Sequence, residues 1–248
     1  MATHLIWDWN GTLLNDADAV LEATNDALAQ FHLGAAGAIS GLKEKQISPV
    51  VGPLTVTEYR AAFTRPLQRF YANIFGREIT EDEFVQLEQL FHAAYLKRCA
   101  PSVLNQGARG VLGSWQQAGC TQSLLSLWPN DELLTLAAQL ELTDFFIRID
   151  GRRGLNAGCK AAPLRQHLAA LAAQTIEAEH VVLIGDALDD AAAATAAGVR
   201  CVLFAGGAHE VAELVATGHP VAHTLAQAVA IASDPHCSAC SAADIAAR

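Results

Sequence analysis

Residues 4–14 read HLIWDWNGTLL, and this stretch decides the fold. The short apolar run His4–Trp9 predicts a buried β-strand, and Trp9-Asn10-Gly11-Thr12 follows Asp8. Asp8 therefore stands at the end of the first strand. An aspartate at such a place often caps a turn, so its role depends on what the rest of the chain brings beside it.

The remainder of the chain alternates strand and helix patterns. Four further strands are predicted at Ser123–Leu127, Phe146–Asp150, Val181–Asp186 and Arg200–Ala205. Helices are predicted at Ala108–Ala118, Asp131–Leu142, Lys160–Gln174, Asp189–Ala197 and His209–Thr217. This alternation predicts an α/β fold with a Rossmann-like parallel sheet and helices on both faces. In such a sheet the carboxyl ends of the strands share one edge, where ligands bind.

Residues 16–97 interrupt the alternation. They show no convincing strand pattern but several helical stretches, including Ala17–Phe31 and Glu81–Arg98. Two pairs have the spacing of a capping box, a threonine three positions before a glutamate: Thr55 with Glu58, and Thr80 with Glu83. We therefore expect residues 1–15 and 98–248 to form the α/β core, and residues 16–97 to form an inserted all-helical cap.

Composition limits the partners. The chain has 248 residues, 52% of them hydrophobic and 17% charged, with a net charge of −10. Folding of a chain this long buries roughly 70% of the unfolded surface, enough for one core with or without a smaller inserted domain. The acidic balance and the small number of lysines argue against nucleic acid as a partner, because phosphate-backbone binding needs a basic surface. The composition instead fits a protein that takes an anionic ligand in a local pocket.

The sequence also bears on location. It contains no apolar run long enough for a membrane span, and the start MATHLIWD lacks the basic region of a secretory signal. We expect a cytoplasmic protein without a membrane partner, whose cysteines are free thiols. Cys237 and Cys240 form a C-x-x-C pair beside His236, which by spacing alone is weak evidence for metal or redox use. No feature of the sequence specifies an oligomeric state.

Four polar features fall where strands end or the next helix begins. They are Asp8, Ser126, Lys160 and the acidic group Asp186, Asp189 and Asp190. A carboxylate can attack phosphorus, and Mg²⁺ held by oxygen ligands offsets its repulsion from an anionic substrate. A hydroxyl and an ammonium can hold the phosphoryl oxygens. Each residue alone has an ordinary explanation as a helix cap or a solvated charge, but together they favour phosphoryl chemistry.

The same residues resemble the four motifs of the haloacid dehalogenase-like (HAD) hydrolases. The motifs are similar to DWNGTLL at residues 8–14, Ser126, Lys160, and Gly185-Asp186 with Asp190. The resemblance covers the whole chain in the right order and looks closest to the phosphoglycolate phosphatase-like branch. It implies a helical cap of the first type (C1) between the first two motifs, a Mg²⁺ cofactor and a small phosphorylated substrate.

The resemblance also implies a role for each matching residue. Asp8 would be the nucleophile, and the backbone carbonyl of Asn10 would be a magnesium ligand beside Asp8. The phosphate would be bound by Thr12, Ser126 and Lys160. Lys160 would in addition stabilise the nucleophile, and Asp186 and Asp190 would hold the metal.

The sequence departs from the family at Asn10. Phosphatases of this family carry a second aspartate there, which protonates the leaving group and then activates water. An amide cannot carry a proton, so a contribution of roughly 10²–10⁴-fold to the rate is in question. The backbone carbonyl of this residue is unaffected by the change, so metal binding is not threatened.

Two alternatives stay open because of Asn10. Phosphonoacetaldehyde hydrolases, which cleave a P–C bond, also lack the second aspartate and need a cap lysine that forms a Schiff base. Lys43 and Lys45 are the lysines clearly within the expected cap, although an exposed helix face is their ordinary explanation. The other alternative is a catalytically impaired phosphate-binding or regulatory member of the family.

Overall fold

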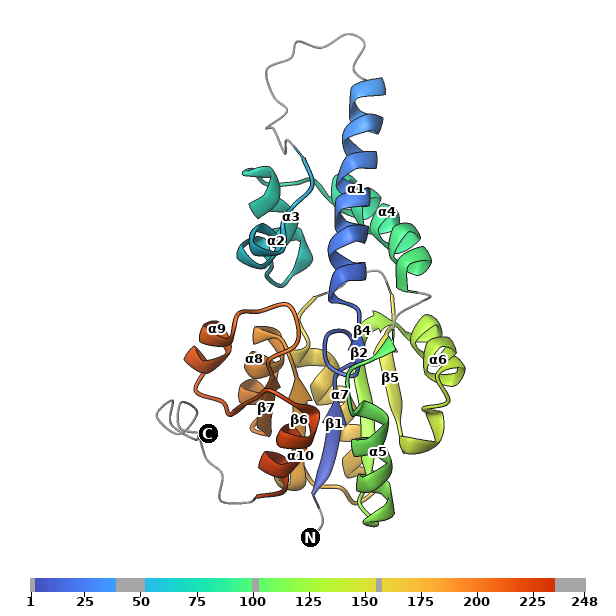
Figure 1. Ribbon diagram of the computed structural model, residues 1–248, viewed down its shortest axis with the longest axis vertical. Helices are drawn as coiled ribbons and strands as arrows, with labels where there is room; N and C mark the ends of the chain where they lie inside the picture. The colour runs from blue at the N-terminus through green and yellow to red at the C-terminus, as the bar shows by residue number, and fades with distance from the viewer. Residues whose placement is uncertain (1–2, 39–51, 100–102, 155–157, 235–248) are drawn as a thin grey trace. The chain divides into compact units, whose positions relative to one another are not determined.

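A computed structural model describes residues 3–38, 52–99, 103–154 and 158–234, with side chains only as far as residue 32 in the first range. The chain divides into two compact units, Met1–Asn15 with Val103–Arg248, and Asp16–Ser102. Lys43, Lys45 and the pair Cys237 and Cys240 lie outside the described residues. Figure 1 shows the elements of each unit.

The first unit is built on a six-stranded sheet whose strands all pair in parallel. Its order is β5-β4-β1-β6-β7-β8. The bounds are β1 (His4–Trp7), β4 (Gln122–Pro129), β5 (Ile149–Arg152), β6 (Val181–Gly185), β7 (Arg200–Phe204) and β8 (Val221–Ala222). A separate antiparallel pair joins β2 (Leu14–Asn15) to β3 (Val103–Leu104). The predicted parallel α/β fold is therefore confirmed.

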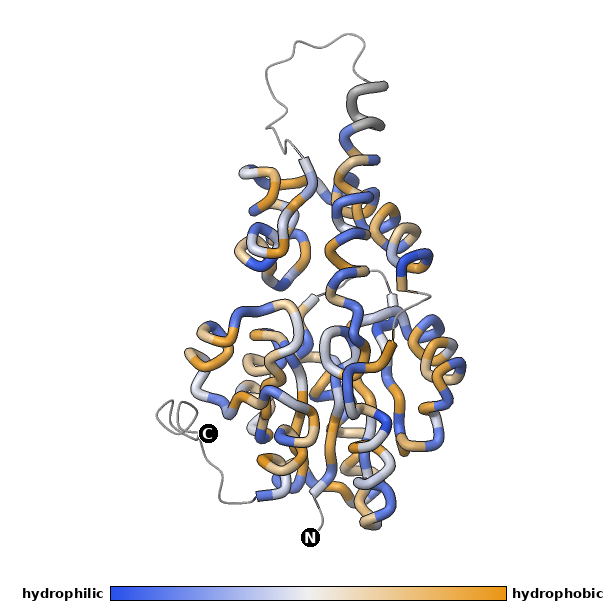
Figure 2. Tube along the Cα trace, viewed as in Figure 1, coloured by the Kyte–Doolittle hydropathy of each residue, from blue (hydrophilic) through white to orange (hydrophobic). Residues whose placement is uncertain are grey.

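Apart from His4 at the start of β1, the two central strands are apolar. Leu5, Ile6 and Trp7 in β1 have no exposed surface, and neither have the residues Val181–Ile184 in β6. A parallel strand with helices on both faces must be apolar on both sides, which is why these strands lack the alternation of a half-exposed sheet. Figure 2 shows the hydrophobic colour running along the strands of this unit.

Helices cover the sheet of the first unit (Figure 1). They are α5 (Ala108–Gln117), α6 (Asn130–Gln139), α7 (Ala161–Ala172), α8 (Leu188–Ala197), α9 (Val211–Ala216) and α10 (Leu225–Ser233). Helix α7 packs against α8, and α10 packs against α5. One buried cluster joins Leu164 and Leu171 of α7 to Ile6 and Leu183 of the central strands. Within the described ranges, no helix is long and apolar enough to cross a membrane.

Several boundaries differ from those expected. Strand β1 ends at Trp7, so Asp8 is the first residue beyond it. Strand β5 begins at Ile149, three residues later than expected, and a 3-10 turn at Thr143–Phe145 precedes it. Helix α6 ends early, at Gln139, and Glu141 takes a left-handed φ of 52° that no helix continues through. Strand β8 was not predicted, because two residues are too short to show a period.

The second unit consists of helices α1 (Ala17–Ala38), α2 (Val56–Ala62), α3 (Leu67–Phe75) and α4 (Glu81–Cys99), and its described residues contain no strand. Helix α1 packs along α4. The buried residues are largely aromatic: Phe31, Tyr59, Phe70, Tyr71, Phe75 and Phe84, with Leu28 and Leu87. Both expected capping boxes form, at Thr55 with Glu58 and at Thr80 with Glu83. The boundary expected after residue 97 falls inside α4, which keeps Arg98 and Cys99 in this unit.

Candidate active site

Asp8 stands at the carboxyl edge of the sheet. Its backbone N–H donates to the carbonyl of Ile184 at 2.8 Å, which continues the pairing of β1 with β6 by one residue. Its side chain comes from the strand at the middle of the sheet and is largely buried, with 8% of the residue exposed. The edge where parallel strands end is the usual ligand site of such a sheet, so Asp8 occupies its centre.

The turn after Asp8 is held tightly. Gly11 has a φ of +73°, and a Cβ there would lie 2.6 Å from Oδ2 of Asp186, so backbone conformation and space both require glycine. The side-chain amide of Asn105 donates to the carbonyls of Thr12 at 2.8 Å and Gly11 at 3.2 Å. The turn is thereby fixed from the segment that follows β3.

Thr12 has a hydrogen-bond partner that its sequence context does not predict. Its hydroxyl donates to Oδ1 of Asp186 at 2.7 Å, and Thr12 has no exposed surface. A hydroxyl has one proton to donate, and this one already binds a carboxylate, so the hydroxyl cannot donate to a phosphate as well. The geometry makes Thr12 a residue that orients Asp186.

Asp186 follows β6 and is also held by the loop after β7. The N–H of Ala208 donates to its Oδ2 at 3.2 Å. A Cβ on Gly207 would lie 1.7 Å from the same oxygen, so the loop approaches the carboxylate as closely as a backbone can. Two donors from distant segments therefore fix Asp186.

Lys160 joins Asp8 to Asp190. It precedes the first residue of α7, and its Nζ lies 2.7 Å from Oδ1 of Asp8. The same ammonium donates to Oδ1 of Asp190, whose Oδ2 accepts the N–H of Ala187 at 3.0 Å. The backbone N–H of Lys160 donates to Oδ2 of Asp189 at 2.8 Å. The acidic start of α8 thus binds both the side chain and the backbone of the lysine.

Ser126 lies inside β4 rather than at its end. The pairing of β4 with β5 shifts register between Leu125 and Pro129, so Ser126 sits where the ladder is interrupted. Its oxygen accepts the N–H of Trp128 at 3.0 Å. An oxygen that accepts in this way keeps its own proton, so this hydroxyl, unlike that of Thr12, has a proton to donate to a ligand.

Burial and mutual repulsion determine the charge of the cluster. Burial raises the pKa of Asp8 to about 6, against the opposing effect of Lys160, and Asp190 adds to the rise. Burial also raises the pKa of Asp186 well above its ordinary value, with Asp8 and Asp190 adding to it. Burial alone would lower the pKa of Lys160, but the carboxylates of Asp190 and Asp8 outweigh it and raise that pKa. Burial is therefore the main reason that the pKa values of Asp8 and Asp186 are raised, carboxylate repulsion adds to it, and Lys160 offsets part of the rise at Asp8.

This donor set fits a divalent cation. Asp8, Asp186 and Asp190 each offer an oxygen, and these atoms all lie within 4.8 Å of one another. When all three carboxylates are ionised, Lys160 compensates one charge and leaves two. Mg²⁺ binds carboxylate oxygens in proteins, and its two positive charges would neutralise the net charge of −2 that remains on the cluster.

The structure brings together most of the residues singled out in the sequence. Asp8, Lys160, Asp186 and Asp190 form one connected group, Thr12 supports it, and Asn10 lies in the turn beside Asp8. Sequence reasoning missed Asn105 and the backbone of Ala208 as supports. The glycine pair before Ala208, following a strand end at the same edge, is the signal from which the second could have been found.

Comparison with known proteins agrees with this geometry. A family model described as haloacid dehalogenase-like hydrolase matches residues 2–198. No curated protein matches the chain. A haloacid dehalogenase-like family hydrolase from Streptococcus pneumoniae is 20% identical, with a TM-score of 0.72 over 92% of this chain and 97% of that one.

Two further solved structures share the fold. One is a predicted phosphatase from Clostridium acetobutylicum, 15% identical, with a TM-score of 0.74 over 91% of this chain and 95% of that one. The other is a predicted phosphoglycolate phosphatase from Haemophilus somnus, 15% identical, with a TM-score of 0.71 over 93% and 97%. At these identities the likeness is one of fold.

Proposed function

The chain belongs to the haloacid dehalogenase-like hydrolases, and from this premise we propose that it is a Mg²⁺-dependent phosphatase of a small phosphorylated metabolite. In this proposal Asp8 is the nucleophile and forms an aspartyl phosphate. The Asp16–Ser102 unit acts as the cap that selects the substrate.

One observation carries the proposal. The Asp8 carboxylate lies at the centre of the sheet edge, with Nζ of Lys160 2.7 Å from its Oδ1. One oxygen from each of Asp8, Asp186 and Asp190 lies within 4.8 Å of the other two. A buried carboxylate beside an ammonium and a divalent-cation donor set has the parts that phosphoryl transfer requires. A purely structural salt bridge would not need two further carboxylates in the same space.

In the first step an Asp8 oxygen attacks phosphorus. The bond from phosphorus to the leaving oxygen breaks, and that oxygen leaves with the electron pair. Lys160 binds Oδ1 of Asp8, which fixes the rotation of the carboxylate. Its ammonium also places a positive charge beside the phosphoryl group during the transfer. The Ser126 hydroxyl has a proton with which to bind a phosphoryl oxygen.

Asp8, Asp186 and Asp190, with the backbone carbonyl of Asn10, are the groups that would hold Mg²⁺. When bound there, the ion supplies the positive charge that lets the anionic substrate approach the carboxylate. Thr12 and the N–H of Ala208 keep Asp186 turned toward the cluster.

In the second step water attacks the phosphorus of the aspartyl phosphate. The acyl–phosphate bond breaks, inorganic phosphate leaves with the oxygen and the protons of the water, and the Asp8 carboxylate is restored. Asn10 cannot take the proton from water as an aspartate would. We therefore propose that this step limits turnover and that the aspartyl phosphate accumulates.

The experiment that tests the function is a screen of alkyl, aryl and acyl phosphates with Mg²⁺ and with chelator. The matched pair of variants is Asp8→Asn in the site and Asp144→Asn at an exposed turn. We expect Mg²⁺-dependent release of phosphate by the native protein and Asp144→Asn, and none by Asp8→Asn. Turnover retained by Asp8→Asn would exclude the covalent mechanism.

Asn10 itself supports a second candidate, a phosphate-binding protein that turns over poorly. That candidate predicts Mg²⁺-dependent binding of phosphate without release from any ester in the screen. Asn10→Asp then separates the two, because it restores the missing carboxylate without touching the metal ligands.

A further inference from the structure

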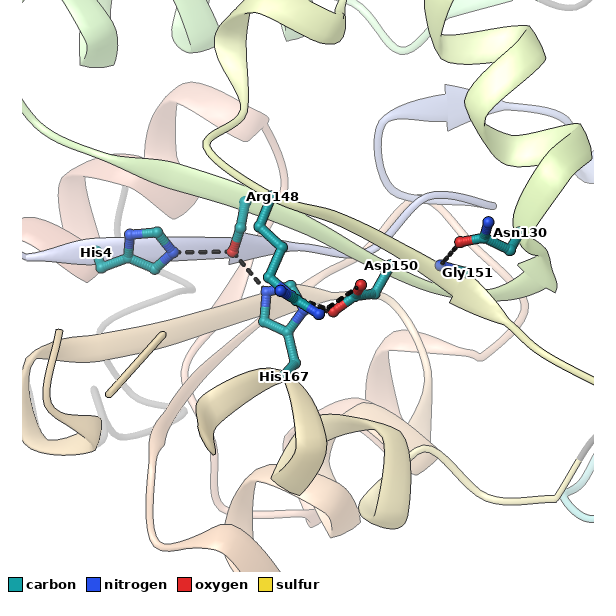
Figure 3. A network of polar contacts seen from close by, with 7 residues as sticks. His4, Asn130, Arg148, Asp150, Gly151 and His167 are labelled. Atoms are coloured by element: carbon teal, nitrogen blue, oxygen red, sulfur yellow. Dashed lines mark hydrogen bonds and ion pairs between the residues drawn. The ribbon is translucent and has the colours of Figure 1, made fainter. Parts of the chain in front are cut away.

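The first unit contains a second cluster of titratable side chains, which does not include Asp8, Asp186 or Asp190. Figure 3 shows it connecting β1, β5 and α7 through His4, Asp150 and His167. The Ser123 hydroxyl joins both histidines, at 2.8 Å from Nε2 of His4 and 2.8 Å from Nε2 of His167. Nδ1 of His167 lies 2.7 Å from Oδ2 of Asp150. His4, Ser123 and His167 are buried, with 1%, 0% and 0% exposed.

The tautomers of His4 and His167 set the direction of the hydrogen bonds in this cluster. Asp150 accepts two N–H groups from Arg148, at 2.5 and 2.9 Å, and an ionised carboxylate can only accept. Nδ1 of His167 must therefore donate to Asp150. In neutral His167 the other nitrogen accepts the Ser123 proton, and the Ser123 oxygen then accepts from Nε2 of His4. The chain ends where the Thr121 hydroxyl donates to Nδ1 of His4 at 2.8 Å.

The order Ser123, His167, Asp150 is that of a serine-hydrolase triad, but the cluster is not a second catalytic centre. Ser123 has no exposed surface and neither has His167. The Ser123 oxygen is also bound by His4. A substrate carbonyl has no route to a hydroxyl so enclosed, so the cluster acts within the fold.

Its position points to that role. His167 lies on the buried face of α7 between Leu164 and Leu171. Apolar contacts such as those of the two leucines are not directional. The two ring nitrogens of His167, by contrast, each have a fixed partner, one on β4 and one on β5. His167 therefore fixes the position of α7 relative to the sheet and prevents the helix from sliding along its axis.

Lys160 depends on that setting. It stands seven residues before His167, two helical turns or about 10 Å along the axis, and its backbone is helical. Seven residues return to nearly the same side of a helix, so both residues face the sheet. A shift of α7 along its axis would move the Lys160 ammonium from its place between Asp8 and Asp190.

We propose that His167 is a positioning residue for Lys160, acting through the series of hydrogen bonds that links Thr121, His4, Ser123, His167 and Asp150. These hydrogen bonds connect α7 to β1, β4 and β5 and so keep the Lys160 ammonium beside Asp8. This inference rests on the proposed function for its catalytic consequence, but the placement of Lys160 can be measured without any activity.

The test compares His167→Leu with Leu171→Ala. The second variant removes apolar contact from the same face of α7 but leaves the series of hydrogen bonds intact. Ser123→Ala, which removes one hydroxyl, is the milder variant if His167→Leu does not fold. His167→Asn is the conservative variant, because its amide can still donate to Asp150. Two quantities are measured: kcat and KM, and the rate at which an amine-acylating reagent labels Lys160, followed by peptide mass spectrometry relative to exposed Lys97.

We expect His167→Leu to label Lys160 several-fold faster than the native protein and to lower kcat about 10-fold or more with little change in KM. Ser123→Ala should change both in the same direction, His167→Asn should recover part of each, and Leu171→Ala should change neither. Equal labelling of Lys160 in His167→Leu and Leu171→Ala overturns the inference, and so does an unchanged kcat in an active enzyme. If the native protein has no phosphatase activity, faster labelling still supports the positioning while the proposed function fails.

Discussion

The hydroxyl of Thr12 donates to Oδ1 of Asp186 across 2.7 Å, although the two residues are 174 positions apart in the chain. This bond ties the turn after β1 to the end of β6. It also favours a supporting role for Thr12, because a hydroxyl that donates to a carboxylate has no proton left for a phosphate.

The first prediction follows from that bond. Thr12→Val keeps the shape of the side chain and removes the donor, so Asp186 loses one of its two fixed partners. Loss of such a supporting hydrogen bond typically weakens metal affinity by about 10- to 100-fold. We expect the Mg²⁺ concentration for half-maximal activity to rise by that factor, while Thr12→Ser stays near the native value. An unchanged Mg²⁺ requirement with a raised KM would instead restore Thr12 to phosphate binding.

The second prediction concerns metal and stability. Because the three carboxylates repel one another, Mg²⁺ should stabilise the folded protein. A ligand at 100 times its Kd contributes about 2.7 kcal/mol, or roughly 5 to 10 °C in Tm. Asp186→Asn should abolish this rise and should itself raise the Tm of the metal-free protein, since it removes a buried charge whose pKa is raised. Asp144→Asn is the control, and a Mg²⁺ shift that survives Asp186→Asn would count against the metal site.

The third prediction concerns Lys160. Lys160→Met keeps an unbranched apolar stem and removes the charge that faces Asp8 and Asp190. We expect kcat to fall about 10²–10³-fold with a smaller change in KM, because the charge matters most when the phosphoryl group is in transfer. Lys97→Met provides the matched control. A raised KM at native kcat would show that Lys160 only binds substrate.

The catalytic carboxylates could be predicted because they follow strand ends, whereas hydrogen bonds between residues distant in sequence could not. Asp8 and Asp186 could be placed together because each follows an apolar run, and parallel strands end at one edge. The phosphate role expected for Thr12 comes from the family resemblance, and the hydrogen bond to Asp186 could not be predicted because its partner lies in a distant segment. Asn105 and Ala208 were missed for the same reason: one acts through a side chain after β3, the other through a backbone N–H.

The buried chain of His4, Ser123, His167 and Asp150 shows a second limit. Each residue was read only as part of a strand or helix, since a single polar residue in an apolar run has no periodicity of its own. The element bounds show the same limit, because the apolar run predicts a strand from Phe146, whereas β5 begins at Ile149. Local propensity predicts which elements form, and tertiary contacts decide where they begin and end.

The fourth prediction is a pH dependence of stability from His4. Burial lowers the pKa of His4 from 6.5 to about 4, and neighbouring His167 adds to the decrease. The unfolded chain therefore binds a proton between these pH values that the folded chain does not, and stability falls as pH falls. The contribution is complete above pH 6.5 and is lost progressively down to about pH 4, for a total of about 3 kcal/mol.

Chemical unfolding at several pH values measures this slope. His4→Gln should remove that part of the slope while lowering stability at neutral pH. His223→Gln, at an exposed position, should keep it. A slope that is the same in His4→Gln and in the native protein would mean that other groups cause it.

The last prediction concerns Asn10, where the chain departs from its family's phosphatases. An amide cannot protonate an alkoxide, so alkyl phosphates should turn over slowly, while aryl and acyl phosphates, whose leaving groups need no proton, should react faster in the first step. Hydrolysis of the aspartyl phosphate then lacks its base, and Asp8 should carry a phosphoryl group during turnover, seen as a burst of product and as an adduct in intact mass spectrometry. Asn10→Asp should remove the adduct and raise turnover of alkyl phosphates on the order of 10²-fold or more. Alkyl phosphates that stay slow in Asn10→Asp, with no adduct in either protein, would mean that the proton is carried by another residue or that the chain binds phosphate without hydrolysing its esters.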